Sequence, residues 1–138
     1  DRSVTGGPDR WRVGGRVGGF EGRQQKRGER GGGVAAACAA ADAAARALCR
    51  TGPIGDAARA DVAAAKIRAG EAATTGSAIA HQVHGAIGFT YEHALHLSTR
   101  RLWAWRDSFC TEADWAAVLG EMAIAAGPEG LWAFVTGR

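Results

Sequence analysis

Residues 63–88 read AAAKIRAGEAATTGSAIAHQVHGAIG, an alanine-rich stretch that ends in two closely spaced glycines. Alanine is the best helix-forming residue, and small side chains let helix axes approach closely. The large apolar residues Ile67, Ile79 and Val83 stand among the alanines. Asp56, a residue type that caps helices, precedes the pattern. The stretch therefore predicts one long helix, from about residue 57 to His84, at the centre of a helical bundle.

Further helices are predicted on both sides of this stretch. Residues 34–50 (VAAACAAADAAARALCR) are again rich in alanine, and the turn at 51–55 (TGPIG) separates them from the central helix. A third helix is expected from about Glu92 to Ser108, because apolar residues recur there at helical spacing and form a stripe. The members of the stripe are Leu95, Leu102, Trp105 and Phe109.

A fourth helix is expected to open at Thr111. Acidic residues follow in its first turn, where negative charge suits the helix dipole, and Gly127-Pro128 ends it before a short last segment. Its expected buried face consists of Trp115, Val118, Leu119 and Met122. The sequence lacks the alternation typical of strands. We therefore predict an all-α fold, an up-and-down antiparallel four-helix bundle over residues 34–138.

The first 33 residues differ in composition from the rest. They hold 11 of the 21 glycines and carry eight Lys and Arg against four Asp and Glu, a net charge of +4, whereas the whole chain carries +3. Glycine opposes both helix and strand, and apolar residues are too sparse here for a core. Residues 1–33 are therefore expected to be a disordered Gly/Arg-rich tail, and the pI of about 9.1 reflects this tail.

Two other interpretations of the tail are possible. Arginine and glycine mixed with aromatic residues also occur in RNA-binding tails. The repeats are irregular here and the excess charge is small, so we expect no nucleic-acid partner. Alternatively, the tail is a mistranslated or damaged copy of a segment that belongs to a longer protein.

The three cysteines, Cys38, Cys49 and Cys110, include no pair at the C-x-x-C spacing of zinc sites. Cys38 and Cys49 would lie about 16 Å apart along one helix, too far for a disulfide. We expect reduced, buried thiols in a cytoplasmic protein. No apolar run approaches the roughly 20 residues that cross a bilayer, and no secretion leader opens the chain, so no membrane partner is expected.

Four histidines fall within sixteen residues, in two pairs at i, i+3 spacing: His81 with His84, and His93 with His96. Residues at this spacing share one face of a helix, as metal ligands do. The alternative is that they are partly buried or surface histidines near a helix break. No carboxylate or cysteine completes a recognisable ligand set, although Glu92 is nearby, so no metal site is predicted.

A motif follows the central helix. Gln82, Gly85, Ala86 and Gly88 come first, then Phe89-Thr90-Tyr91-Glu92 and Arg100-Arg101. With these residues the chain resembles the C-terminal helical domain of the acyl-CoA dehydrogenase family. In that family an alanine-rich helix leads to Gln-x-x-Gly-Gly-x-Gly, a Thr-x-Glu stretch and an Arg-rich helix. The resemblance covers about residues 34–125 and is strongest from 61 to about 112. Ala86 departs from the pattern, because it stands where the second glycine is expected.

The resemblance implies that this turn contacts the FAD of a neighbouring subunit. Glycines at a helix end permit positive φ and close backbone approach, and N–H groups freed there bind phosphate or ribose oxygens. The implied contacts are Gln82, Gly85, Ala86 and Gly88, with the methyl group of Ala86 hindering the approach. The alternative is a simple inter-helix turn without a ligand.

The resemblance implies that the family's base position falls on Phe109. In many members a Glu-Gly-Thr triplet holds a glutamate that removes the α-proton of the acyl-CoA while the flavin takes hydride from the β-carbon. Counted without gaps, this triplet falls on Phe109-Cys110-Thr111, and phenylalanine accepts no proton. Thr111 remains as an implied flavin or ribose contact, and no catalytic residue is predicted. Glu112 and Asp107 are the nearest carboxylates, but both are out of register.

Two explanations of the missing glutamate are open. Either the base lies on another helix, as in some members, or the chain is the non-catalytic half of a paired dehydrogenase, which we favour. The family's N-terminal helical and middle β-domains have no counterpart here. The resemblance thus implies a fragment or non-catalytic subunit of an FAD-dependent acyl-CoA dehydrogenase of lipid metabolism, inactive alone and holding FAD weakly or not at all.

The implied partners follow from the same resemblance. They are another acyl-CoA dehydrogenase subunit, in a homo- or hetero-oligomer, the acyl-CoA substrate in the full assembly, and electron-transfer flavoprotein as the usual acceptor. The competing hypothesis belongs to a different class: a structural helical bundle that mediates subunit association without binding flavin.

Overall fold

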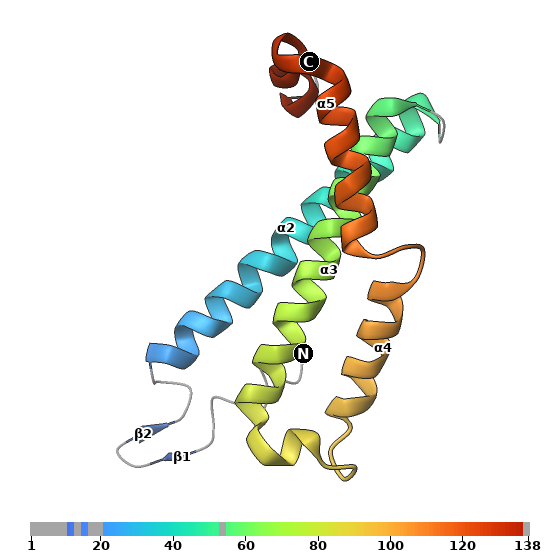
Figure 1. The fold of residues 1–138 in the computed structure, drawn as a ribbon. Helices are drawn as coiled ribbons and strands as arrows, with labels where there is room; N and C mark the ends of the chain where they lie inside the picture. Colours follow the sequence, from blue (N-terminus) through green and yellow to red (C-terminus); the bar gives the residue numbers. More distant parts are fainter. Residues whose placement is uncertain (1–10, 13–14, 17–20, 53–54, 137–138) are drawn as a thin grey trace. The chain divides into compact units, whose positions relative to one another are not determined.

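The structure is a computed structural model, and it describes residues 11–12, 15–16, 21–52 and 55–136. The α-helices within these residues are α2 (Glu21–Thr51), α3 (Asp56–His84), α4 (Leu95–Asp107) and α5 (Glu112–Thr136), and the 3-10 helix η2 (Gly85–Phe89) follows α3 directly. Two short strands, β1 (Trp11–Arg12) and β2 (Gly15–Arg16), pair antiparallel. The predicted all-α fold class is confirmed (Figure 1).

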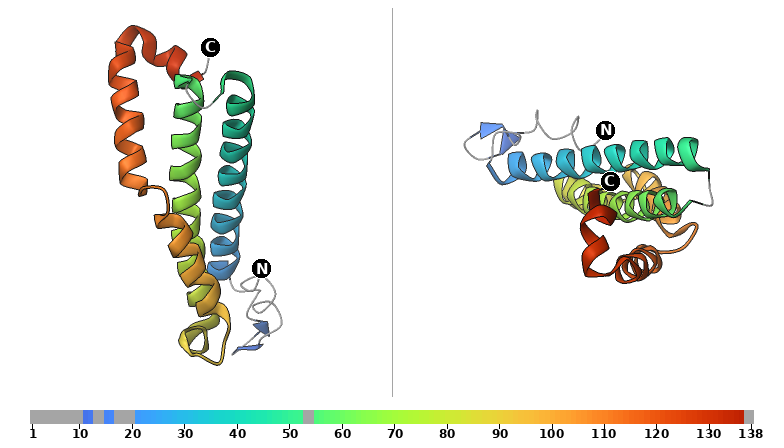
Figure 2. Two further views of the ribbon diagram at one scale, coloured as in Figure 1. Left: turned by 90° about the vertical axis from the view of Figure 1, so that its right-hand side faces the viewer. Right: turned by 90° about the horizontal axis from the view of Figure 1, so that it is seen from above.

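The chain divides into two compact units, and the long helices α2 and α3 contribute to both. Unit 1 consists of Asp1–Ala35 and Glu71–Arg106, and unit 2 consists of Ala36–Gly70 and Asp107–Arg138. Within each unit the segments of α2 and α3 lie side by side and run in opposite directions (Figure 1 and Figure 2). Each unit thus has the antiparallel packing expected of up-and-down helices.

In unit 1, α3 and α4 pack antiparallel. Arg106 of α4 donates a hydrogen bond to the hydroxyl of Thr74 in α3 at 3.1 Å. About two turns further along α3, His81 Nε2 lies 3.1 Å from the hydroxyl of Thr99 in α4. The core between and around these contacts contains Ile79, Ala80, Val83 and Leu95. Ile79 and Val83 are thus buried as the sequence pattern predicts, because they lie on the face of α3 that α4 covers.

In unit 2 the core consists of small side chains. Its fully buried or nearly buried residues are Ala44, Ala47, Ala58 and Ala63. Helix α2 ends at Thr51, and the next residue, Gly52, has φ +71° and donates its N–H to the Leu48 carbonyl at 2.9 Å. Glycine is favoured there because a Cβ is strained in this left-handed conformation. Alanine faces of this kind let two helices approach closely.

Several predicted buried faces are more exposed in the structure than the sequence indicates. Leu95 of the α4 stripe is buried, but Trp105 is 64% and Phe109 is 90% exposed. Helix α5 has no buried residue, although it begins and breaks where expected, with a non-helical Gly127 before Pro128. The reason is that each unit offers only a few helical segments to cover these apolar faces.

The structure corrects the predicted boundary at Val34. Helix α2 begins at Glu21, so residues 21–33 are helical, whereas residues 1–10, 13–14 and 17–20 of the expected tail lie outside the described residues. Good helix formers such as Gln25 and Lys26 stand between the glycines, and tertiary packing adds support. The aliphatic part of Arg30 lies against Gly76 of α3, and burial lowers the pKa of Arg30.

Alanine substitutions test whether residues 21–33 are helical. No neighbouring atom lies within 4 Å of a Cβ built at Gly31 or Gly32. Replacing Gly31 or Gly32 by alanine is therefore expected to stabilise the protein by about 0.5–1 kcal/mol each and to raise the helical circular-dichroism signal. Gly52→Ala is the control: it places a Cβ in the left-handed region and is expected to cost about 1–2 kcal/mol. Unchanged stability and helicity in G31A and G32A would contradict the helical assignment.

Two further sequence expectations differ from the structure. Cys38, Cys49 and Cys110 are free, but all three are exposed and not buried. Two segments, Gly28–Thr51 and Leu95–Thr136, are long and apolar enough to cross a membrane by length and composition alone. Alanine-rich bundle helices reach the same hydropathy, and the expected absence of a membrane partner stays a prediction.

Candidate functional site

The first candidate site is the turn that follows α3 in unit 1. Gln82, Gly85 and Ala86 are exposed there. Gly85 has φ +63°, and no atom lies within 4 Å of a Cβ built on it. The backbone at Gly85 is therefore open to close approach by a ligand, and its left-handed conformation favours glycine. These three residues fit a dinucleotide contact made largely by backbone groups at a helix end.

Gly88 has a different environment within the same turn. It is buried, and a Cβ at this position would lie 2.8 Å from the His84 Cβ and 3.2 Å from the Leu95 Cδ2. The first distance is shorter than packed side chains adopt, and the second is tighter than most contacts of a Cβ atom. The structure therefore gives Gly88 a packing role, which brings η2 against α3 and α4, and a cofactor contact at Gly88 stays a prediction.

His81 and His84 lie beneath this turn, and both are buried. The His81 ring stacks on Phe89 with ring centroids 4.5 Å apart, its Nε2 lies 3.1 Å from the Thr99 hydroxyl, and its buried Nδ1 has no hydrogen-bond partner. His84 Nδ1 donates to the Ala80 carbonyl at 2.8 Å, and its ring lies 4.7 Å from that of His93. The His81 ring thus joins η2 to α3 and α4, and the His84 ring joins α3 to His93 in the segment before α4.

The metal alternative is not supported by this arrangement. Across the part of the chain that the structure describes, no three His, Cys, Asp or Glu side chains gather as metal ligands. His96 Nδ1 donates to the His93 carbonyl at 2.8 Å, and the His96 ring meets Tyr91 edge-on. His81 and His84 are buried and His93 and His96 are half-buried near the helix break, and the expectation that no metal binds here stays a prediction.

The second candidate site is the turn between α4 and α5, whose residues 108–111 belong to unit 2. Phe109 and Cys110 have φ of 59° and 74°, in the left-handed region that residues with a Cβ rarely adopt. The Ser108 carbonyl accepts a hydrogen bond from Lys66 Nζ at 2.6 Å, and the Phe109 carbonyl accepts one from Trp115 Nε1 at 2.9 Å. These contacts tie the strained turn to α3 and to α5.

Thr111 closes the turn as the cap of α5. The Asp114 Oδ2 atom accepts hydrogen bonds from the Thr111 hydroxyl at 2.7 Å and from the Thr111 N–H at 2.8 Å. The Asp114 N–H lies 3.3 Å from the Thr111 hydroxyl oxygen. This is a capping box. The sequence predicts the start of the helix at Thr111, and the structure adds the reciprocal pairing with Asp114. The hydroxyl that would contact a flavin is therefore already engaged in the cap.

The same hydrogen bonds make the cap dependent on pH. The Thr111 hydroxyl and then its N–H hold the pKa of Asp114 below the ordinary value of 3.8. Because the folded-state pKa is depressed, the contribution of this carboxylate is fully present above pH 3.8 and is lost as the pH falls through the lowered value. We expect Thr111→Val to move the Asp114 carboxyl titration, followed by NMR, back toward 3.8. An identical midpoint in both proteins would contradict the capping box.

The two carboxylates nearest to Phe109 lie in different environments. Glu112 is half-buried and folds over Gly70 of α3, where a Cβ would overlap its carboxyl group. Asp107 is exposed at the last residue of α4. The side chain at position 109 itself is an exposed phenyl ring, which neither holds nor accepts a proton.

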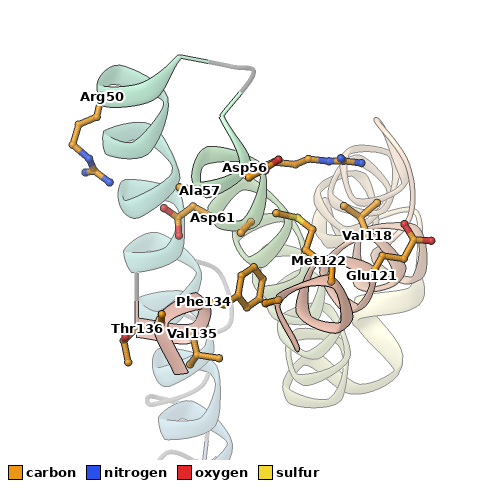
Figure 3. A pocket seen from close by; sticks show the side chains of 15 residues that line it. Arg50, Asp56, Ala57, Asp61, Val118, Glu121, Met122, Phe134, Val135 and Thr136 are labelled. Carbon is orange, nitrogen blue, oxygen red and sulfur yellow. The ribbon is translucent and has the colours of Figure 1, made fainter. Parts of the chain in front are cut away.

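Unit 2 also contains an open pocket of about 1020 Å³, shown in Figure 3. It lies among the end of α2, the start of α3 and both parts of α5. Met122 and Phe134 form part of its apolar lining, and Arg50, Asp56 and Glu121 are among its charged residues. Charges of both signs line it, and none of the residues that the family resemblance singles out is among them.

The structure thus brings Gln82, Gly85, Ala86 and Gly88 together in one turn of unit 1. It places Phe109 and Thr111 together in a turn of unit 2. Sequence reasoning missed Lys66 and Trp115 as the residues that hold this second turn. No local sequence pattern points to Lys66, because its hydrogen-bond partner, the Ser108 carbonyl, lies 42 positions further along the chain.

Comparison with known proteins adds one match. The family model described as acyl-CoA dehydrogenase, C-terminal domain, matches residues 9–107. The match includes the first candidate site and ends just before the α4–α5 turn. No curated protein and no solved structure matches the chain.

Proposed function

The chain belongs to the acyl-CoA dehydrogenase family, and on that premise we propose that it serves as the C-terminal helical domain of an FAD-dependent acyl-CoA dehydrogenase. In this role it acts as a non-catalytic half that is inactive alone. The parent reaction is α,β-dehydrogenation of an acyl-CoA thioester. The family is generally FAD-dependent and oligomeric, and FAD accepts the hydride in its reaction.

One observation supports the cofactor role most strongly. At the end of α3 the open, left-handed Gly85 stands beside the exposed Gln82 and Ala86. The chain's own contribution is then to present backbone N–H groups and the Gln82 amide to phosphate or ribose oxygens. Gly88, His81 and His84 hold this turn against the helices from behind. The Ala86 methyl group limits the approach of the backbone.

The absence of a base supports the non-catalytic assignment. Phe109 occupies the position that the family register gives to the glutamate, and Glu112 is packed over Gly70. Removal of a proton from carbon requires a base within hydrogen-bonding reach. In the proposed role another subunit or segment supplies that base, while Thr111 caps α5.

The cofactor role is tested by titrating the purified chain with FAD and following the flavin fluorescence. Ala86→Gly restores the family's second glycine and is expected to tighten weak binding by about 2–10-fold, the value of one added hydrogen bond. Gly85→Val, which places a branched side chain in the left-handed region, is expected to abolish it. Identical titrations for the wild type and both variants would favour the alternative, a structural module without flavin binding.

Self-association is expected from the exposed aromatic residues. Trp105 of α4 and Trp132 of α5 are 64% and 76% exposed, and exposed apolar surface of this kind marks association sites. We propose that the chain pairs with a second copy or with another subunit of the family. Sedimentation at tens of micromolar should show oligomers, and the double variant Trp105→Ser, Trp132→Ser should shift them toward monomer. A monomeric wild type would contradict the proposal.

A further inference from the structure

The α4–α5 turn combines a strained backbone with an exposed side chain. Phe109 and Cys110 follow each other in the left-handed region, a conformation that is costly for any residue with a Cβ. The Phe109 side chain is 90% exposed, so burial of its ring does not offset the conformational free energy of the left-handed backbone. Strained residues persist only where the surrounding structure fixes them, and they concentrate at functional sites.

Two side chains fix the backbone immediately before the strained pair and within it. Lys66 Nζ donates to the Ser108 carbonyl at 2.6 Å, and Trp115 Nε1 donates to the Phe109 carbonyl at 2.9 Å. The bond from the ammonium group is charge-assisted and therefore among the stronger kinds. The Thr111–Asp114 capping box fixes the next residue along the chain. All of these residues belong to unit 2.

We propose that Lys66 and Trp115 are positioning residues, which hold the α4–α5 turn rigid so that the side chain at position 109 is presented outward at a fixed place. For its use in the assembled enzyme this inference rests on the proposed function, because position 109 is where the family carries its base. A preorganised turn of this kind loses little conformational freedom when it meets a bound partner or substrate. The rigidity itself is a property of this chain without any ligand.

Backbone ¹⁵N relaxation of the full chain tests the proposal directly. The amides of Phe109 and Cys110 are expected to have order parameters of about 0.85 in the wild type, the value of a rigid backbone. Lys66→Met, which removes the ammonium donor and keeps the aliphatic chain, should lower them below about 0.6. Lys66→Arg keeps a charged donor and should retain most of the wild-type value. Arg46→Met, an exposed charge of the same unit, is the matched control and should change nothing.

Trp115→Phe keeps an aromatic ring but removes the N–H donor, and it is expected to lower the order parameter of Phe109. It also keeps the test decisive if Lys66→Met fails to fold, which circular dichroism would show. Order parameters below 0.6 in the wild type, or unchanged values in both variants, would overturn the proposal. Since no flavin takes part, a mobile turn rejects this inference alone, whereas a rigid turn in a chain that never contacts FAD rejects only the proposed function.

Discussion

Phe109→Glu is expected to raise the rate of acyl-CoA dehydrogenation by about 10²–10⁴-fold in a chimera that carries residues 61–125 of this chain. The chimera replaces the corresponding segment of a full-length family member that keeps its own glutamate at the base position. Without the substitution the chimera should be almost inactive, because a phenyl ring cannot take the α-proton. Turnover of an acyl-CoA substrate with an artificial electron acceptor measures the effect.

Phe109→Gln is the matched control for this experiment. Glutamine has the shape of glutamate and lacks its basicity, so a gain with Glu and none with Gln assigns the effect to proton removal. A chimera that is already active with Phe109 would show that the register is wrong. In that case Glu112, Asp107 or a base outside the grafted segment would remove the α-proton.

Gly88→Ala is expected to destabilise the protein by about 1–3 kcal/mol, the range for overpacking a tight site. The added Cβ would lie 2.8 Å from the His84 Cβ and 3.2 Å from the Leu95 Cδ2, so η2 must shift away from the end of α3 and the Leu95 side chain must also give way. Because small domains are only marginally stable, this is a large part of the free energy of unfolding. Chemical denaturation followed by circular dichroism gives the difference.

Gly120→Ala is the control for that substitution. Gly120 lies in α5, and no atom lies within 4 Å of a Cβ at this position. Alanine there should be neutral or stabilising, because it reduces the conformational entropy of the unfolded chain. If Gly88→Ala proves equally harmless, η2 does not pack against His84 and Leu95 as described.

The long helices were predictable from local signals. The central helix was expected over about 57–84 and is observed as Asp56–His84, because an alanine run between a capping aspartate and a glycine leaves few alternatives. The break at Gly127-Pro128 follows from the same kind of signal. The start of α2 at Glu21 was not predictable from composition, because packing of Arg30 against Gly76 supports a helix that its glycines oppose.

The candidate site was predictable in part. The residues of the glycine turn could be named from the family resemblance, but the separate roles of Gly85 and Gly88 could not. The backbone of Gly85 is left-handed and open to solvent, whereas Gly88 is enclosed by His84 and Leu95. That difference depends on contacts between α3, η2 and α4. The contact of Lys66 with Ser108 joins residues 42 positions apart, and no local pattern indicates such a bond.

The central claim is that the turn after α3 contacts FAD in an assembled acyl-CoA dehydrogenase. The flavin content of the chimera with residues 61–125, purified and measured by its visible absorbance against protein concentration, tests this claim most directly. We expect a folded, assembled chimera to retain FAD, with more FAD retained by the Ala86→Gly variant and little or none by Gly85→Val. A folded and assembled chimera that is colourless, both with and without Ala86→Gly, would contradict it.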